Sequence, residues 1–463
     1  MKKQFLIFAL AMGSVQVFAG GVITNTNQST QFVRTVSRNA SLDDDAVYFN
    51  PAATAQFSEG LHLSYSHQVC IQKRTTTDDF PTLNNHEYEG NVFVPAFPNL
   101  YATWKKNNLA LFFGFGPVGG GGSAEYEKGL ASFERQISMM PGMITSMGSS
   151  MGLSASAYDV NINFTGTSIL YGGRIGGAYS FLDDKLAVSL GVAAIYQKNA
   201  YKGSIKDIQL NPTCALLGMN GDMMPATTFF TTLSTALASL NPTMAATAAA
   251  YAGAVADKEV DAVQTGFGLA PIVGFNFKPD DRLNIGIKYE GRTKMELTND
   301  TKKDDTGMFT DDSTFRKDIP AIVSLGIGGN FTDKFRGSFS YTYYFDKNAD
   351  WGGREEQMDK NTMDVAGSLE YDVIPLLTLS AGYSRSISGT SEEFQTDMDY
   401  ALSSNAFGMG GRLNLSEKLK VDFGFMYVAY DKVEKSSTFN SVSHTESFDR
   451  TNKSFSLGVS YAF

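Results

Sequence analysis

The chain has 463 residues, of which 43% are hydrophobic and 12% aromatic, and its formal net charge at pH 7 is −10. The acidic balance argues against nucleic-acid binding, which normally leaves a basic footprint. The sequence lacks the several apolar runs of roughly 20 residues that a bundle of membrane helices requires. The composition does not exclude a membrane β-barrel, because every second residue of its strands faces a polar lumen and lowers the mean hydropathy.

The first residues have the pattern of a secretory signal peptide. Lys2 and Lys3 precede the apolar stretch FLIFALAMG, and the segment VFA ends on the small Ala19. A segment of this kind directs export and is too short to span a membrane. We therefore expect a signal peptide over residues 1–19.

From about residue 60 onward, the chain repeats alternating apolar stretches. In the last stretch, SFSLGVSYAF, the bulky residues fall on one face of an extended strand and the small ones on the other. Many stretches exceed the roughly 5–6 residues typical of a soluble sheet and suit tilted strands that cross a bilayer. About 14 can be counted, near 60–73, 91–105, 107–117, 162–182, 185–203, 260–278, 282–298, 316–332, 334–348, 359–373, 376–390, 398–415, 418–435 and 448–463.

The connections between these stretches alternate in length. Tight turns such as KKN, DDK, PDD and SEK alternate with long segments, of which 118–161 and 204–259 are the longest. Short turns at one rim and long loops at the other are typical of an outer-membrane barrel. The sequence thus predicts an all-β protein, a 14-stranded antiparallel transmembrane β-barrel over residues 59–463. Its bulky side chains would contact outer-membrane lipid, while Arg174, Lys288, Arg336 and Asp422 point into a wet interior.

Residues 20–58 break the alternating pattern. The segment LDDDAVYFNPAA places an acidic cluster, Asp43 to Asp45, five residues before an Asn-Pro turn. A capped helix and a surface turn would explain it. The alternative is a luminal plug, because a wide barrel leaves an aqueous hole that something must close.

Three segments resemble the FadL/TodX family of long-chain fatty-acid and hydrocarbon transporters (the OmpP1-like proteins). FNPAA just before the first strand is similar to the family's hatch, and GFGPVGGGGSAEY to the segment after its third strand. DIPAIVSLGIGGNFTDKFRGSFSYTYYF resembles a later barrel segment, and the likeness covers essentially the whole mature chain. The resemblance implies a 14-stranded barrel, an N-terminal hatch over 20–58 and uptake of hydrophobic compounds. It also makes Asp44, Asn50 and Pro51 candidate gating residues of the hatch.

The two longest loops carry apolar stripes at helical spacing. An exposed loop has no need of them, so they form either a lid whose helices pack together or a capture groove for an amphipathic ligand, to which flexible Met side chains are suited. Pro141 is expected to split the first stripe in two. Family members have a weak outer site between their third and fourth loops, and the resemblance implies a similar arrangement for this chain. The candidate ligand-binding residues are Phe133, Ile137, Met140, Ile144 and Met147 in the first loop and Phe230, Leu233 and Leu237 in the second.

A ligand with a carboxylate favours a cation beside its apolar pocket. Lys198 and Lys202 near the end of the fifth strand are candidates, as are Arg292, Lys294 and Lys347 on later strands, although each such residue is more often a solvated rim charge. Lys198 is preferred because family members carry basic residues near that strand end.

The third strand ends in GFGPVGGGG, in which Gly114, Gly116 and Pro117 weaken or remove strand pairing. This is either plain strand termination or a kink that opens the barrel wall, as the family resemblance implies. An apolar ligand gains nothing by entering an aqueous periplasm, so a lateral opening into the membrane would make physical sense.

No set of residues has the spacing of an active site or a metal site. The histidines are scattered, so a phospholipase barrel is disfavoured, and we expect no enzyme activity, cofactor, metal or nucleic-acid partner. Cys70 and Cys214 could pair in an oxidising compartment, but their wide separation favours free thiols.

We expect passive uptake of hydrophobic compounds across the bacterial outer membrane. Loops would capture the ligand, a luminal pocket would receive it, and it would leave past the hatch, laterally through a kinked third strand. The alternatives are a general porin for small polar solutes and a structural or adhesive barrel. Phe463 at the C-terminus also resembles the signal read by the barrel assembly machinery, an expected partner during biogenesis.

Overall fold

The computed structural model describes residues 21–463, so the expected signal peptide lies outside the described residues. Across these residues, no helix combines the length and apolar character needed to cross a membrane. The barrel strands form one antiparallel sheet, and β20 pairs with β1 along its length, from His62↔Ala462 to Asp78↔Glu446, which closes the sheet on itself.

Three strands of the barrel are interrupted and appear as consecutive segments. β10 and β11 both pair with β9, β12 and β13 pair with β11 and β10, and β18 and β19 both pair with β20. The barrel therefore has 14 strands, which confirms the predicted fold. They are β1 (Gly60–Asp78), β2 (Glu87–Lys106), β3 (Leu109–Tyr126), β4 (Tyr158–Phe181), β5 (Leu186–Leu210), β9 (Lys258–Phe277), β10 (Leu283–Glu290) with β11 (Glu296–Asp304), β12 (Thr314–Arg316) with β13 (Ile322–Asn330), β14 (Phe335–Tyr344), β15 (Met363–Ile374), β16 (Leu377–Ile387), β17 (Ser404–Asn414), β18 (Leu419–Tyr430) with β19 (Val433–Phe439), and β20 (Val442–Ala462).

The alternation within a strand divides outside from inside as predicted. On β20, Leu457 is 61% exposed, whereas Ser454 and Ser456 on the opposite face are 0% and 8% exposed. Arg174, Lys288 and Asp422 are buried in the lumen. A buried charge is stable only where polar groups or ion-pair partners offset the cost of removing it from water. The face of bulky apolar side chains therefore points outward, and the buried core of the protein lies inside the barrel.

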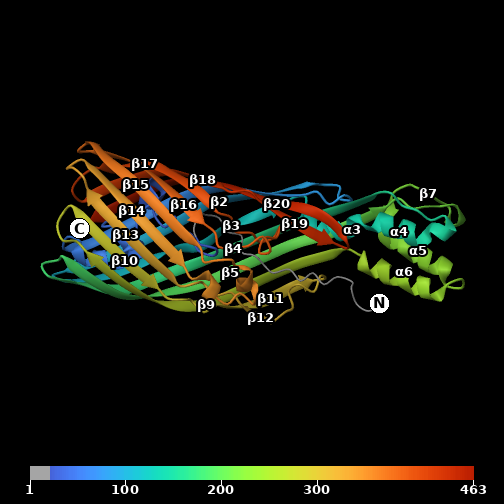
Figure 1. The fold of residues 1–463 in the computed structure, drawn as a ribbon. Helices are drawn as coiled ribbons and strands as arrows, with labels where there is room; N and C mark the ends of the chain where they lie inside the picture. The colour runs from blue at the N-terminus through green and yellow to red at the C-terminus, as the bar shows by residue number, and fades with distance from the viewer. Residues whose placement is uncertain (1–20) are drawn as a thin grey trace.

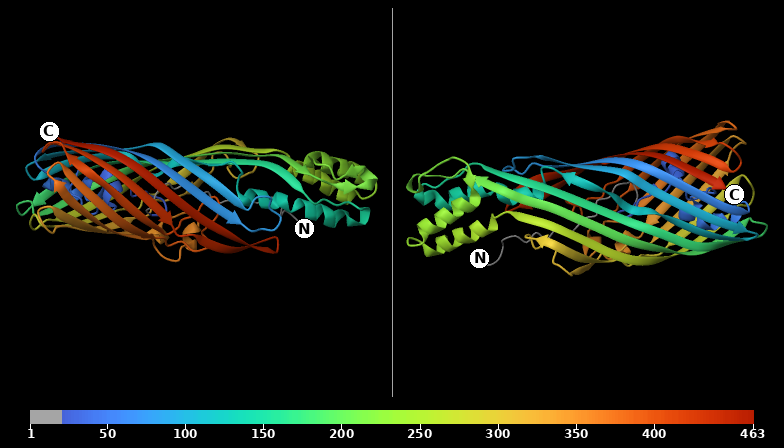
Figure 2. Two further views of the ribbon diagram at one scale, coloured as in Figure 1. Left: turned by 90° about the horizontal axis from the view of Figure 1, so that it is seen from above. Right: turned by 180° about the vertical axis from the view of Figure 1, so that it is seen from behind.

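Strands β4, β5 and β9 run on past the others and carry an arm of helices at their ends (Figures 1 and 2). The arm contains α3 (Ala131–Ser138), α4 (Met140–Gly148), α5 (Ala226–Leu237) and α6 (Pro242–Ala254), with the short segments β6 (Thr213–Cys214), β7 (Met219–Asn220) and β8 (Met224–Pro225). The predicted helices are present, and Pro141 separates α3 from α4 at the first turn of α4. The loops are shorter than predicted, 127–157 and 211–257, because β3, β4 and β5 continue beyond the membrane-crossing length.

Residues 21–59 fold into the barrel as a hatch. They form α1 (Thr30–Thr35), α2 (Ala46–Phe49) and a 3₁₀ turn η1 (Pro51–Gln56), and almost all of them are buried. The lumen admits the hatch because glycines face it: at Gly382, a Cβ would lie 1.8 Å from the carbonyl oxygen of Thr35. Cys70 on β1 and Cys214 in the second long loop are both buried free thiols.

Candidate functional site

An ion-pair network fastens the hatch to the barrel wall. The Asp422 carboxylate on β18 accepts hydrogen bonds from Arg34 Nε of α1 at 2.9 Å and from Arg412 Nε of β17 at 2.9 Å. Arg34 also pairs with Glu370, and both Asp422 and Arg34 are fully buried. Breaking a pair of this kind leaves a buried charge without a partner, so the network holds α1 firmly.

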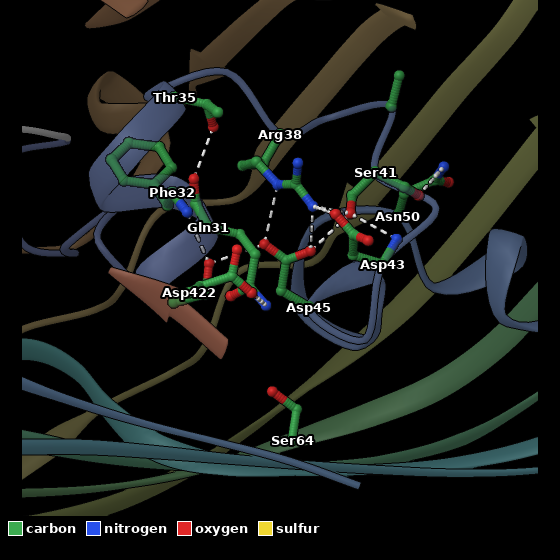
Figure 3. A network of polar contacts seen from close by, with 12 residues as sticks. Gln31, Phe32, Thr35, Arg38, Ser41, Asp43, Asp45, Asn50, Ser64 and Asp422 are labelled. Atoms are coloured by element: carbon green, nitrogen blue, oxygen red, sulfur yellow. Dashed lines mark hydrogen bonds and ion pairs between the residues drawn. The ribbon is translucent and has the colours of Figure 1, made fainter. Parts of the chain in front are cut away.

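The predicted acidic cluster lies in the same region of the hatch (Figure 3). Arg38 donates to both carboxylate oxygens of Asp45 at 2.7 and 3.0 Å and to Asp43 at 2.7 Å, and Arg412 bonds the other oxygen of Asp43. Asp44, the member that we singled out as a gating residue, is half-buried and lies 4.0 Å from His62 Nδ1. Asp43 and Asp45 therefore anchor the hatch, and Asp44 faces the start of β1.

The other hatch residues hold the turn before β1. Asn50 is fully buried and donates to Asn276 Oδ1 of β9 at 2.7 Å and to the carbonyl of Ser41 at 3.2 Å. Pro51 occupies the first turn of η1, where its missing N–H costs nothing. Asn50 therefore binds the end of the hatch to the wall, and Pro51 begins the turn that leads into β1.

The helical arm covers an apolar cavity of about 440 Å³. Helices α3 and α4, the end of β5 and helix α6 line it, so segments far apart in the sequence meet there. Its lining is rich in Met and contains Lys258 as its one basic side chain: Thr82, Phe133, Gln136, Ile137, Met139, Met140, Gly142, Met143, Ser146, Ile205, Ile208, Tyr251, Ala254, Lys258 and Asn440. We call it the outer cavity.

The structure brings three of the predicted ligand-binding residues of the first loop, Phe133, Ile137 and Met140, to the outer cavity. Ile144 is buried in the core of the arm and Met147 is half-buried, and neither lines the cavity.

The predicted residues of the second loop support the cavity from behind. Phe230, Leu233 and Leu237 are buried in the core between α5 and α6. The ring of Phe230 stacks on Tyr251, a lining residue, with ring centroids 5.2 Å apart. This arrangement combines both of the readings of the stripes, since the helices pack together and also enclose a cavity.

The structure places the two predicted lysines away from the cavity. Lys198 is exposed on the outer face of β5, because its neighbours Gln197 and Asn199 take the luminal positions. Lys202 is exposed as well and lies 3.6 Å from the carboxylate of Asp261. Lys258 at the start of β9 takes the position beside the apolar cavity instead, with Nζ 3.5 Å from the carbonyl of Asp305.

A second cavity, of about 370 Å³, lies above the start of the hatch, and we call it the inner cavity. Apolar groups and three basic side chains line it: Val22, Ile23, Asn299, Met308, Thr310, Ser313, Thr314, Phe315, Arg316, Lys317, Trp351, Gly352, Arg354, Phe394 and Asp399. Burial alone would raise the pKa of Asp399, but the charges of Arg354, Lys317 and Arg74 outweigh burial and hold that pKa below its usual value. Two of the three basic side chains of the inner cavity are held in ion pairs, Arg354 with Asp399 and Arg316 with Asp318, each at 2.6 Å.

A narrow cavity of about 30 Å³ lies between the two. It shares Phe133, Ile205 and Lys258 with the outer cavity and Met308 with the inner cavity. The outer and narrow cavities share lining residues from β5 and β9, and the inner cavity follows beyond Met308, against β11, β12 and the start of the hatch.

The barrel wall has a gap between β2 and β3. Their ladder pairs Val92↔Ala124 and next pairs Leu100↔Phe115, so residues 93–99 and 116–123 have no partners across the gap. Gly114 lies at the edge of the gap, packed against Tyr101 and Val47, while Gly116 and Pro117 lie within it. β3 stays paired with β4 through two bulges, so it bends away from β2.

The start of the hatch covers the gap from inside. The backbone N–H of Asn25 donates to the carbonyl of Val118 at 2.8 Å, and its side-chain amide donates to the carbonyl of Gly120 at 2.7 Å. Gly120 has φ +60, and a Cβ there would lie 2.1 Å from the carbonyl oxygen of Ser168, so only glycine fits.

Several of these residues were not predicted, although the sequence around some of them indicates their role. Pro95 and Pro98 in VPAFP remove N–H donors on the β2 side of the gap, as Pro117 does on the β3 side. Arg34 and Arg38, four residues apart just before three aspartates, indicate an ion-pair cluster. Phe309 and Lys258 carry no local signal, because only the folded barrel brings them to the cavities.

The chain matches the family model described as "Outer membrane protein transport protein (OMPP1/FadL/TodX)" over residues 145–463. No curated protein matches it.

Solved structures share its fold at low sequence identity. A FadL homologue from Pseudomonas aeruginosa is 13% identical, with a TM-score of 0.62 over 96% of this chain and 100% of that one. The toluene transporters TodX of P. putida (13% identity, TM-score 0.54, 91% of this chain and 94% of that one) and TbuX of Ralstonia pickettii (14%, 0.52, 96% and 99%) are also similar.

Proposed function

This chain belongs to the OMPP1/FadL/TodX family of outer membrane transport proteins, and on that premise we propose that it takes up long-chain fatty acids and similar apolar compounds. The compound binds first in the outer cavity, passes the narrow cavity and enters the inner cavity above the hatch. It then leaves through the gap between β2 and β3 into the membrane. The series of three cavities with shared lining residues is the observation that carries the proposal.

The outer cavity suits an amphiphile. Burial of apolar surface contributes roughly 25 cal/mol per Å², so a long hydrocarbon chain gains several kcal/mol by leaving water for a wall of Met, Ile and Phe. A carboxylate at the end of that chain would find the ammonium of Lys258 at the cavity wall. The inner cavity repeats the combination, with Trp351 and Phe394 beside Arg316 and Lys317.

The gap supports lateral release. An apolar molecule that left through the hatch would enter water, whereas one that left between segments 93–99 and 116–123, which do not pair with each other, would enter the hydrocarbon. Phe93 and Phe115 on the outer side of the gap are 62% and 47% exposed, so the exit is lined by apolar surface. Asn25 and the segment that follows it would have to move for the ligand to pass.

The hatch argues against a general porin. A porin for polar solutes needs an open aqueous lumen, and here the fully buried Arg34 and Asp422 hold α1 across it. We therefore expect little steady ionic current through the protein in a planar bilayer.

The test is uptake of palmitate and of toluene by proteoliposomes that contain the purified protein. Ile137→Asp puts a charge on the wall of the outer cavity, where burial of an unpaired carboxylate is costly, and should lower initial uptake by about tenfold or more. Leu216→Asp on the same arm is the matched control, because Leu216 is 80% exposed and lines none of the three cavities described above. Equal uptake by the two variants, or none by the wild type above protein-free vesicles, would refute the proposal.

A further inference from the structure

The segment 305–313, which joins β11 to β12, reaches into the passage between the two large cavities. Its residues Gly307, Thr310, Asp311 and Asp312 are exposed, as expected of an extracellular turn. Phe309 in their midst is fully buried, with 0% of its surface exposed. We call this segment the flap.

The flap is a preformed turn built around one carboxylate. Asp304 accepts hydrogen bonds from the backbone N–H groups of Thr306 at 2.9 Å, Gly307 at 2.9 Å and Phe309 at 2.6 Å, and from the Thr306 hydroxyl at 2.6 Å. The hydroxyl of Thr301 donates to the carbonyl of Phe309 at 2.7 Å. Both backbone polar groups of Phe309 are thus bound to β11, and its side chain is aimed inward.

Inside the barrel, the ring of Phe309 completes an aromatic wall. It lies 5.1 Å from the ring of Tyr201, which lies 6.3 Å from Phe164, and Phe164 makes an edge contact with Phe133 at 5.6 Å. Phe133, Phe164 and Phe309 line the narrow cavity together with Met308.

The volumes show that the passage is closed in this conformation. The narrow cavity of about 30 Å³ is roughly the share of one water molecule in the liquid, whereas the cavities on either side hold about 440 and 370 Å³. No organic ligand fits without a movement of its lining. Of its aromatic lining, Phe164 lies on a strand fixed by its ladder and Phe133 lies on α3, whereas Phe309 lies on a turn between strands, so we take the flap as the wall that moves. Around Gly307 the turn is open, because a Cβ there would have no neighbour within 4 Å.

We propose that Phe309 is the specificity-determining residue of the passage and that Asp304 positions it. The flap admits unbranched chains and single flat rings, which displace Phe309 by a small rotation, and it stops branched or polycyclic molecules. This inference rests on the proposed function and names the shape of the compounds that pass. The gate lies before the inner cavity, so selection takes place before the ligand reaches the hatch.

The experiment compares two probes, palmitate and a palmitate analogue with a terminal pyrene, in proteoliposomes of the full-length protein. Phe309→Ala should raise the initial uptake of the pyrene analogue relative to palmitate by about tenfold, the scale on which one or two carbon groups are discriminated in an apolar site. Phe309→Leu should give an intermediate ratio, and it keeps the test valid if the alanine variant folds poorly. Asp304→Ala should shift the ratio in the same direction, because it releases the turn without altering the ring.

The matched control is Phe448→Ala, which removes an equally buried ring on β20 that lines none of the three cavities. A changed ratio in the Phe309 variants but not in the control supports the gate. An unchanged ratio in folded Phe309 variants, with wild-type palmitate uptake intact, would overturn the gate and leave the proposed function standing. Absence of palmitate uptake by the wild type would overturn both.

Discussion

Asp422→Asn is the substitution that most directly tests how the hatch closes the barrel. It removes the negative charge between two buried guanidinium groups, those of Arg34 on the hatch and Arg412 on the wall, each 2.9 Å away. Arg34 keeps Glu370 and Arg412 keeps Asp43 after the change, so the cost is that of weakened charge-assisted hydrogen bonds, about 1.5–3 kcal/mol, and not the larger cost of an orphaned charge. At 1.4 kcal/mol per power of ten, the docked state of the hatch should lose roughly one to two powers of ten in its equilibrium constant.

The barrel itself should survive the change, because its strands are held by the backbone ladder and not by this carboxylate. The assay is the ionic current of single molecules in a planar bilayer, together with the thermal unfolding of the barrel in detergent. We expect frequent openings of the variant and few of the wild type, with nearly unchanged barrel unfolding. Asp431→Asn is the control, since its pair with Arg385 is 43% and 31% exposed and worth about 0–1 kcal/mol. A variant at Asp422 as silent as the Asp431 control would contradict the anchoring role.

Two further substitutions test the cavity and the gap. Lys258→Met should weaken binding of palmitate by about tenfold, the value of one charge-assisted hydrogen bond, and leave toluene binding unchanged in fluorescence titrations; equal losses for both ligands would show that Lys258 acts only through packing. Gly120→Val should lower the melting temperature by several degrees, because Gly120 has φ +60 and a Cβ there would lie 2.1 Å from a carbonyl oxygen. The control is Gly142→Ala, which should be neutral or slightly stabilising because a Cβ at Gly142 would have open space around it. Similar melting temperatures for these two glycine variants would mean that the bend of β3 tolerates a side chain.

The barrel could be predicted from the sequence because its cause is local. A side-chain period of two places Leu457 outside and Ser456 inside whatever the rest of the chain does, and the short turns set the register from one strand to the next. The helices of the arm followed in the same way from their spacing and from Pro141. The kink at Gly116 and Pro117 was visible for a similar reason, since a missing N–H donor weakens pairing wherever it lies.

The candidate site was predicted only in part. Phe133, Ile137 and Met140 were found because they form one face of consecutive helices, and those helices cover a cavity. Lys198 was predicted beside the ligand but lies on the outer face of the barrel wall. The face on which one lysine lies depends on strand register, which a single residue does not reveal. The lysine beside the cavity, Lys258, is the first residue of β9, and the pairing of β9 with β5 brings it there. Nothing near it in the sequence indicates that role.

The sequence by itself determined that this chain is a barrel with an outward apolar face and helical loops, because periodicity and turn chemistry act over a few residues. A plug was one of two interpretations of the segment before the first strand, and the fold decided between them by burying that segment in the lumen. Only the tertiary structure decided which side chains meet across the lumen: Asp422 with Arg34, Asn25 with the bend of β3, and Phe309 with the aromatic wall. Those contacts join residues tens to hundreds of positions apart, and their geometry depends on the closure of the sheet, which no local pattern encodes.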